Sequence, residues 1–253
     1  MSIVYGPVPS WRLGRSLGID LLPAGGKTCC FDCIYCQLGR TARPLAERAD
    51  FVSPDALARE LEAVRGVPAD YVTFSGMGEP TLGANLGEAI RLARRALGLP
   101  VAVLTNSSLM TREDVREDLA FADVVVAKLD APDEQLFQRI NRPLAGFSLE
   151  ETVEAIALFR RTYRSRMALQ IMFVEANRDA ARQLAAIAAQ LAADEVQINT
   201  PLRPCAVAPL PPETLAAIRE EFRDLPGVHI VYEATKPEVM PFDQQETLRR
   251  RPE

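Results

Sequence analysis

Short apolar runs alternate with longer amphipathic stretches along most of the chain. In the amphipathic stretches apolar residues recur at helical spacing, as at Leu57 and Leu61, after Ser53 as an N-cap and Pro54 at the first helical position. The apolar runs have strand length, as expected for buried strands. The predicted strands cover residues 17–22, 70–75, 101–105, 123–129, 168–174 and 195–198, with 228–232 as a last, edge strand.

Strand, loop and helix thus repeat about six times, which predicts a parallel sheet with helices outside it. The alternation fits a partial (β/α)6 barrel of TIM type and also a doubly wound open sheet. Gly6, Pro7 and Pro9 punctuate residues 1–16, for which we expect an ordered loop. We expect one domain over 1–233 and a loosely held polar tail over 234–253.

Composition and charge narrow the class of protein. The chain has 253 residues, of which 48% are hydrophobic and 25% charged, enough for a full core. The net charge of −5 argues against indiscriminate binding of nucleic acid. With no apolar run near membrane length and no signal sequence in view, we expect a cytoplasmic protein. Two arginine groups could contact phosphates or be solvated surface: Arg40, Arg43 and Arg48, and Arg160, Arg161, Arg164 and Arg166.

The strongest chemical signal is a cysteine loop, in which four of the five cysteines fall within eight residues. Cys29, Cys33 and Cys36 have the spacing C-x3-C-x2-C. Thiolates suit an iron–sulfur cluster or zinc. Three ligands to a cubane of four irons leave one iron open, where a small molecule can bind and react.

Other uses of these cysteines are weaker. A zinc site would need a fourth ligand, and the remaining candidates, His229 and Cys205, are distant in sequence. Disulfides are disfavoured in a reducing cytosol. Cys30 lies outside the spacing and is expected to be a passenger that could replace a lost ligand. We expect Cys205 to be a free thiol and His229 to be structural.

Polar and glycine residues gather after the predicted strands, where reactive groups of parallel barrels lie. Asn106 and Ser107 end the third strand, Lys128 and Asp130 lie at the end of the fourth, and Asn199 follows the sixth. Each could equally be a helix cap or a strand-end turn. Gln170, Met172 and Gln197 alternate on the last strands, and Arg203 follows them as a contact for an anionic substrate or an exposed residue. The second strand runs into Gly76, Met77, Gly78, Glu79 and Pro80.

The cysteine spacing, the aromatic Tyr35 before Cys36 and the glycine loop one βα unit later resemble the radical S-adenosylmethionine (SAM) superfamily. This resemblance favours the partial barrel over the open sheet. It implies that Cys29, Cys33 and Cys36 bind a [4Fe–4S] cluster whose open iron chelates SAM, which is then split into methionine and a 5′-deoxyadenosyl radical. It further implies that the following residues contact SAM: Tyr35 and Asn199 near adenine; Gly76, Met77, Gly78 and Glu79 at the amino group; Lys128 at the carboxylate; and Asn106, Ser107 and Asp130 at ribose, carboxylate or substrate.

The segment from Gly6 to Ile19 resembles the N-terminal signature of a small single-cluster group similar to the tRNA wyosine (imidazoline-guanosine) synthetase. That enzyme carries a second cluster and a lysine that holds pyruvate. This chain has no cysteine before Cys29 and no lysine before Lys27, so only radical generation is carried over. RNA is the first candidate substrate, a small molecule or peptide the second, and a flavodoxin- or ferredoxin-like protein the expected electron donor. The catalytic residues toward the substrate stay unknown. The alternative is a non-catalytic iron–sulfur or zinc protein that carries electrons or binds partners.

Overall fold

The computed structural model describes residues 2–22 and 25–252. Its strands are β1 (Val4–Ser10), β2 (Gly14–Ile19), β3 (Thr28–Cys29), β4 (Arg43–Pro44), β5 (Tyr71–Phe74), β6 (Val101–Thr105), β7 (Val124–Lys128), β8 (Arg166–Met172), β9 (Glu195–Asn199) and β10 (Val228–Ile230). Its α-helices are α1 (Pro54–Ala63), α2 (Leu86–Leu97), α3 (Glu113–Leu119), α4 (Glu134–Ile140), α5 (Leu149–Thr162), α6 (Ala181–Leu191), α7 (Pro212–Glu220) and α8 (Gln244–Arg250). None of the helices in these residues is long and apolar enough to span a membrane.

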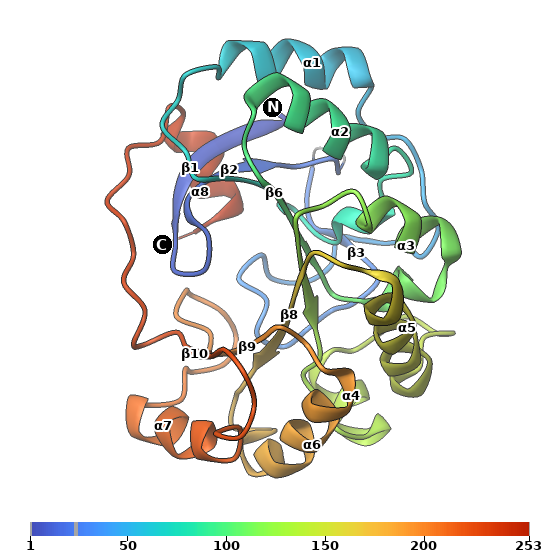
Figure 1. The fold of residues 1–253 in the computed structure, drawn as a ribbon, viewed down its shortest axis with the longest axis vertical. Helices are drawn as coiled ribbons and strands as arrows, with labels where there is room; N and C mark the ends of the chain where they lie inside the picture. Colours follow the sequence, from blue (N-terminus) through green and yellow to red (C-terminus); the bar gives the residue numbers. More distant parts are fainter. Residues whose placement is uncertain (1, 23–24, 253) are drawn as a thin grey trace.

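The main sheet has eight strands in the order β1-β2-β5-β6-β7-β8-β9-β10. From β2 onward every neighbouring pair is parallel and the strands follow one another in chain order. The order never reverses, which excludes the doubly wound sheet. Right-handed crossovers then place the helices on one face, and Figure 1 shows them in an arc around the strands. The sheet curls into the predicted partial barrel.

The two faces of the sheet differ in chemistry, as the alternation of side chains along a strand requires. The outer face, under the helices, is apolar and includes Val103, Val125 and Leu169. The inner face begins with small apolar residues such as Ala102 and Val124. Toward the carboxyl ends of the strands it becomes polar, so that the barrel interior offers hydrogen-bonding groups. The residues there include Lys128, Gln170, Met172, Gln197 and Asn199.

The prediction of a loop over residues 1–16 is wrong. Residues Val4–Ser10 form β1, which pairs antiparallel with β2 and carries the buried side chain of Tyr5. β1 is the edge of the sheet, and an edge strand tolerates Pro7 and Pro9 because one side needs no ladder hydrogen bonds. The prolines and Gly6 were therefore compatible with a strand.

The C-terminal segment also departs from the expectation of a loosely held tail. Residues Gln244–Arg250 form α8, which packs against β1. The helix begins at Asp243, whose side chain accepts a hydrogen bond from the Glu246 backbone nitrogen at 2.9 Å. The Arg250 side chain is only 2% exposed and lies 2.8 Å from the Asp20 carboxylate. Figure 1 shows the chain from β10 running along the open side of the barrel to reach α8.

Candidate functional site

The glycine loop after β5 lies beside the start of the cysteine loop. The Thr28 nitrogen donates to the Met77 carbonyl at 2.8 Å, and the Glu79 nitrogen donates to the Thr28 carbonyl at 3.1 Å. A Cβ atom on Gly78 would lie 1.6 Å from the Thr28 carbonyl oxygen. Gly78 also has a φ of +154°, so only glycine permits this approach of the two backbones. The two motifs predicted from separate stretches of sequence are therefore adjacent.

A second segment, residues 140–144, holds the other side of the cysteine loop. The Ile34 nitrogen donates to the Ile140 carbonyl at 2.9 Å, and the Leu144 nitrogen donates to the Cys30 carbonyl at 2.9 Å. Within the loop, the Cys36 nitrogen donates to the Cys33 carbonyl at 3.1 Å, which closes a tight turn. The cysteines thus sit on a backbone fixed from both sides.

The cysteine sulfur atoms are surrounded by hydrogen-bond donors. The Asn106 amide nitrogen lies 3.6 Å from the sulfur of Cys29 and 3.2 Å from that of Cys30. The Asn141 amide nitrogen lies 3.6 Å from the Cys33 sulfur. Donors at this position stabilise thiolate sulfur and adjust the potential of a bound cluster.

Lys27 brings a positive charge to the three spaced cysteines. Its side chain is only 3% exposed. Burial alone would lower the pKa of Lys27, but the sulfur groups of Cys36, Cys29 and Cys33 outweigh it and raise that pKa. All three predicted ligands therefore lie near one buried ammonium group, which can offset the negative charge of thiolates.

Two of the predicted ligand thiols hold their protons more tightly than an exposed cysteine does. The pKa of Cys29 is raised, first by its hydrogen bond with Cys30 and then by burial. Burial is also the main cause that raises the pKa of Cys33 to about 11. Metal binding displaces such protons. In residues 2–22 and 25–252 no three Cys, His, Asp or Glu side chains gather as a site for one metal ion. A cubane takes its thiolates at separate corners, and three cysteines of one loop, with amide donors and a lysine near them, fit it.

Glu79 is engaged within the chain. Its carboxylate accepts hydrogen bonds from Thr81, from the Thr105 hydroxyl at 2.7 Å and from the Asn106 backbone nitrogen at 2.6 Å. Burial is the main cause that raises its pKa, and these hydrogen bonds oppose it. Glu79 thus links the glycine loop to the end of β6 and fixes the backbone of Asn106.

Three of the expected SAM contacts lie together on the other side of the cysteine loop. The Lys128 ammonium donates to the Tyr35 hydroxyl at 2.8 Å and lies 3.7 Å from the Asp130 carboxylate. The Tyr35 hydroxyl donates to Asp130, whose other oxygen accepts from the Met172 nitrogen at 2.8 Å. Burial, followed by the negative charge of Asp130, raises the pKa of Tyr35, so the phenol stays protonated.

Two other expected SAM contacts, Ser107 and Asn199, are held by fewer side-chain hydrogen bonds. Ser107 adopts a left-handed conformation with φ of +71°, and its buried hydroxyl has no hydrogen-bond partner in the described chain. The Asn199 side chain accepts from the Thr200 nitrogen at 2.9 Å, opposite Met172 in the β8–β9 register. In the described part of the chain, no hydrogen bond joins the Asn199 side chain to Tyr35 or Lys128.

Residues 25–188 match the sequence profile of the radical SAM superfamily. The chain belongs to the radical SAM superfamily. The matched region contains the cysteine loop, the glycine loop and the ends of β6 and β7. The superfamily consists of enzymes that use a [4Fe–4S] cluster and SAM, and these are the cofactors of this chain.

Among related sequences is a UPF0026 protein of Methanocaldococcus jannaschii, which is 37% identical over 211 residues. That match covers 81% of this chain and 65% of the relative, so the chain spans just under two thirds of the relative's length. A UPF0026 protein of Synechocystis is 39% identical over 203 residues, which cover 79% of this chain and 76% of the relative.

Solved structures of radical SAM proteins share the fold at low sequence identity. A structure of TYW1 with a lysine–pyruvate adduct superposes with a TM-score of 0.63 at 16% identity, over 83% of this chain and 74% of that one. The protein anSMEcpe with bound AdoMet gives a TM-score of 0.63 at 18% identity, over 86% of this chain and 64% of that one. These likenesses confirm the partial TIM-like barrel.

Sequence reasoning missed three residues of this candidate site. Lys27 and Asn141 approach the cysteine sulfur atoms, as described above. Asn177 donates to the Asp130 carbonyl at 2.7 Å and so fixes the end of β7. Lys27 was detectable, because a lysine two residues before a metal-binding cysteine is placed to offset thiolate charge. Asn141 and Asn177 lie in ordinary turns, which asparagine favours for local reasons.

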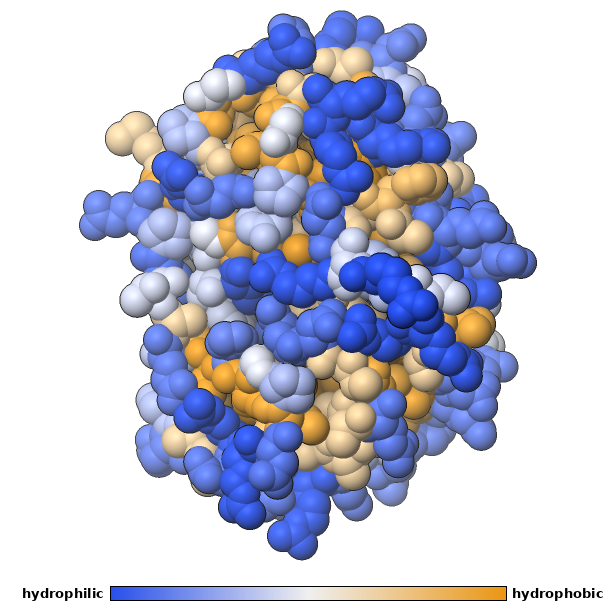
Figure 2. All heavy atoms as spheres, viewed as in Figure 1, coloured by the Kyte–Doolittle hydropathy of each residue, from blue (hydrophilic) through white to orange (hydrophobic). Residues whose placement is uncertain are grey.

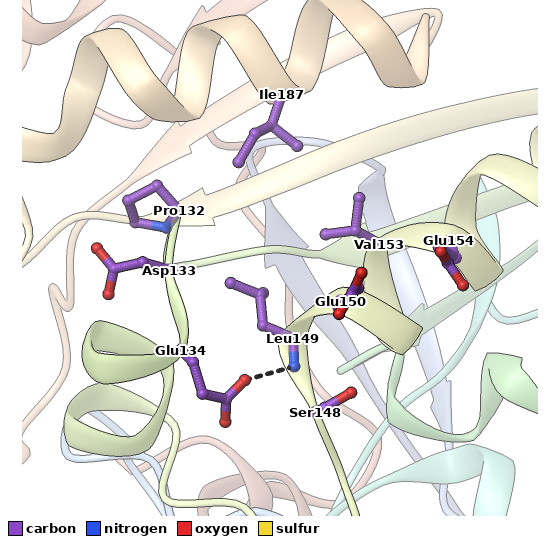
Figure 3. A pocket seen from close by; sticks show the side chains of 9 residues that line it. All are labelled: Pro132, Asp133, Glu134, Ser148, Leu149, Glu150, Val153, Glu154 and Ile187. Carbon is purple, nitrogen blue, oxygen red and sulfur yellow. Dashed lines mark hydrogen bonds between the residues drawn. The ribbon is translucent and has the colours of Figure 1, made fainter.

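A surface pocket of about 580 Å³ lies on the outer, helical side of the barrel (Figure 3). Its carboxylates serve the helices: Asp133 caps α4, and Glu134 accepts from the Leu149 nitrogen at 2.9 Å. None of the cysteines lines it, so it is separate from the cofactor site. The lining residues are Pro132, Asp133, Glu134, Ser148, Leu149, Glu150, Val153, Glu154 and Ile187.

The remaining singled-out residues lie away from this site or are engaged. Arg48 is buried against Asp114 and Asp118, and Arg160 pairs with Asp194 at 2.7 Å. One arginine of each group is thus held in ion pairs, whereas Arg40, Arg43, Arg161 and Arg164 are exposed. His229 is exposed on β10. The Cys205 thiol lies 3.1 Å from the Val207 carbonyl, and Cys205 packs against the apolar cluster that includes Tyr35.

Proposed function

We propose that the protein binds one [4Fe–4S] cluster through Cys29, Cys33 and Cys36 and cleaves SAM reductively. When bound, the cluster supplies the electron that splits SAM into methionine and a 5′-deoxyadenosyl radical, which abstracts hydrogen from a substrate. One observation carries this proposal: the cysteine loop is held between the glycine loop and residues 140–144, with all three cysteines near buried Lys27.

The residues around the loop then have distinct tasks toward SAM. Lys128, which already faces Asp130, is placed to offset the SAM carboxylate, and Tyr35 offers its ring beside it. The backbone of Gly76, Met77 and Gly78 receives the amino group, and Glu79 holds that backbone in place. Further polar groups come from strand ends that face the barrel interior and complete the pocket for ribose and adenine: Asn106, Ser107 and Asn199.

We propose RNA as the first candidate substrate and a small molecule, such as a nucleotide, or a peptide as the second. TYW1 is a fold neighbour, and a nucleotide dehydratase of Lacinutrix mariniflava is 34% identical over 89 residues, about a third of this chain. Another neighbour, SuiB of Streptococcus suis, has been solved with its precursor peptide. A reducing protein of flavodoxin or ferredoxin type is proposed as the electron donor.

The test is the formation of 5′-deoxyadenosine, measured by mass spectrometry. The protein is reconstituted anaerobically with iron and sulfide and reduced with dithionite in the presence of SAM. We expect product from the wild type and loss of at least 100-fold in a Cys33→Ala/Cys36→Ala variant, because the cluster loses two ligands. Arg182→Gln is the control, because the Arg182 side chain is 87% exposed on α6. It should keep wild-type turnover.

Two results would contradict the proposal. Tightly bound zinc without sulfide would support the structural-metal alternative. A fully loaded cluster that neither binds nor cleaves SAM would support an electron carrier or interaction module.

A further inference from the structure

Three arginines approach one another at the open side of the barrel. Arg12 comes from the β1–β2 turn, Arg203 from the loop after β9, and Arg251 from the end of α8. These elements lie at or across the gap between the two edges of the sheet, β1 and β10. Figure 2, in the same view as Figure 1, shows hydrophilic side chains across the middle of the molecule, between more apolar areas.

Arg12 is half-buried, and part of its guanidinium is enclosed without a hydrogen-bond partner. Its Nε and Nη1 atoms are buried and have no hydrogen-bond partner within the described chain. Its guanidinium carbon lies 5.0 Å from the centre of the Trp11 ring, a cation–π contact. This contact does not use the N–H donors of Arg12. Burial first, and then the charges of Arg251 and Arg203, lower the pKa of Arg12 to about 9, whereas Glu195 opposes them.

Two other enclosed arginines of this protein are paired with acids. Arg250 lies 2.8 Å from Asp20 and 2.9 Å from Glu246, and its side chain is 2% exposed. Arg48, whose side chain is 6% exposed, sits between Asp114 and Asp118. Burying a guanidinium with unused donors is costly unless an anion completes it. Arg12 therefore differs from these arginines in a way that indicates an external partner.

The other two arginines connect this position to the cofactor loops. The Nη2 atom of Arg251 donates to the Ser75 hydroxyl at 3.1 Å, directly before Gly76, and its Nε atom is buried without a partner. The Nη1 atom of Arg203 donates to the Gln37 side chain at 3.1 Å, directly after Cys36. A group bound among the arginines would thus lie inside the barrel and near both cofactor-binding loops.

We propose that Arg12, Arg203 and Arg251 form an anion site at the open side of the barrel, which binds a phosphate group of the substrate. The planar guanidinium fork matches phosphate oxygens, and Arg12 and Arg251 have buried nitrogen donors that no group of the described chain uses. Three such donors on two guanidinium groups suit the several oxygens of a phosphate better than a carboxylate. The inference deepens the proposed function, on which it rests, by giving the substrate class: a phosphorylated molecule such as a nucleotide or an RNA end.

The test measures binding of inorganic phosphate to the reconstituted protein with SAM, by calorimetry at constant ionic strength, with acetate as the carboxylate probe. We expect phosphate to bind at least tenfold more tightly than acetate. Arg12→Gln and Arg251→Gln should each weaken phosphate binding at least tenfold. Arg182→Gln is the control, because the Arg182 side chain is 87% exposed on α6, outside the barrel.

Equal phosphate affinity in Arg12→Gln and wild type, or equal affinity for phosphate and acetate, would overturn the proposal. If the variants fail to fold, butanedione labelling of wild-type arginines decides instead. Phosphate should then protect Arg12, Arg203 and Arg251 but not Arg182, and uniform labelling would overturn the site. Formation of 5′-deoxyadenosine is recorded on the same wild-type sample. Turnover without phosphate binding rejects only the anion site, whereas phosphate binding without turnover rejects only radical generation.

Discussion

At the scale of single residues, Gly78 shows how one missing side chain joins two motifs. The Thr28 carbonyl occupies the place of its Cβ, so the cysteine loop and the glycine loop can exchange backbone hydrogen bonds. The close approach explains why a glycine stands there, beyond the usual preference of turns for this residue.

Gly78→Ala is therefore expected to separate the two loops. The new Cβ cannot remain 1.6 Å from an oxygen, so we expect iron loading and SAM binding to fall at least tenfold, measured by iron analysis and equilibrium dialysis. Gly66→Ala is the matched control: Gly66 also has positive φ, but nothing lies within 4 Å of its Cβ position. It should cost only the backbone strain, about 1–2 kcal/mol, and keep both ligands. Similar losses in both variants would mean that strain, not the loop contact, is responsible.

What the sequence could predict at this scale depended on local spacing. The three cysteines are separated by fixed short intervals, and the structure places them near one lysine. Lys128 and Asp130 were predicted from a strand end, and Tyr35 from its position before Cys36; the three side chains do meet. The roles of Glu79 and Asn141 could not be read from sequence, because they depend on which distant backbone atoms their side chains reach.

At the scale of elements, periodicity predicted the six central βα units but not the two ends of the chain. β1 contains prolines, so its local sequence does not predict a strand. It is a strand because it pairs with β2. α8 is short and polar, and its stabilising contacts are with residues more than 200 positions away, such as Arg250 with Asp20. Its N-cap at Asp243, three residues before Glu246, was the one local signal.

The docking of α8 depends on the buried Arg250–Asp20 pair. Arg250→Ala leaves the Asp20 carboxylate buried without its partner, so we expect a loss of about 3–5 kcal/mol in the free energy of unfolding. Urea denaturation followed by circular dichroism measures it. Arg249→Ala is the control, since that side chain is 57% exposed and forms a surface ion pair with Glu246; it should cost no more than about 0.5 kcal/mol. Equal stability of the two variants would show that α8 adds little to the fold.

At the scale of the whole molecule, the partial barrel separates stability from chemistry. The outer face of the sheet and the helices share one apolar core, which also takes in Cys29, Cys30 and Phe31. The rest of the candidate cofactor site is built from loops joined by a few backbone hydrogen bonds. A region of this kind opens at low free-energy cost until a ligand fixes it. Cluster and SAM should therefore stabilise the loops strongly and the helical layer weakly.

Hydrogen–deuterium exchange of the apo and reconstituted proteins tests this separation. On loading with iron and sulfide, we expect at least tenfold slower exchange in residues 27–45 and 140–144, because these segments share the backbone hydrogen bonds that hold the cysteines. SAM should extend the protection to residues 76–80 and to the end of β7. Helix α6 serves as the internal control, since it lies in the outer layer and contributes none of the cysteines. Equal protection of α6 and of residues 27–45 would instead mean that the cluster stabilises the barrel as one cooperative unit.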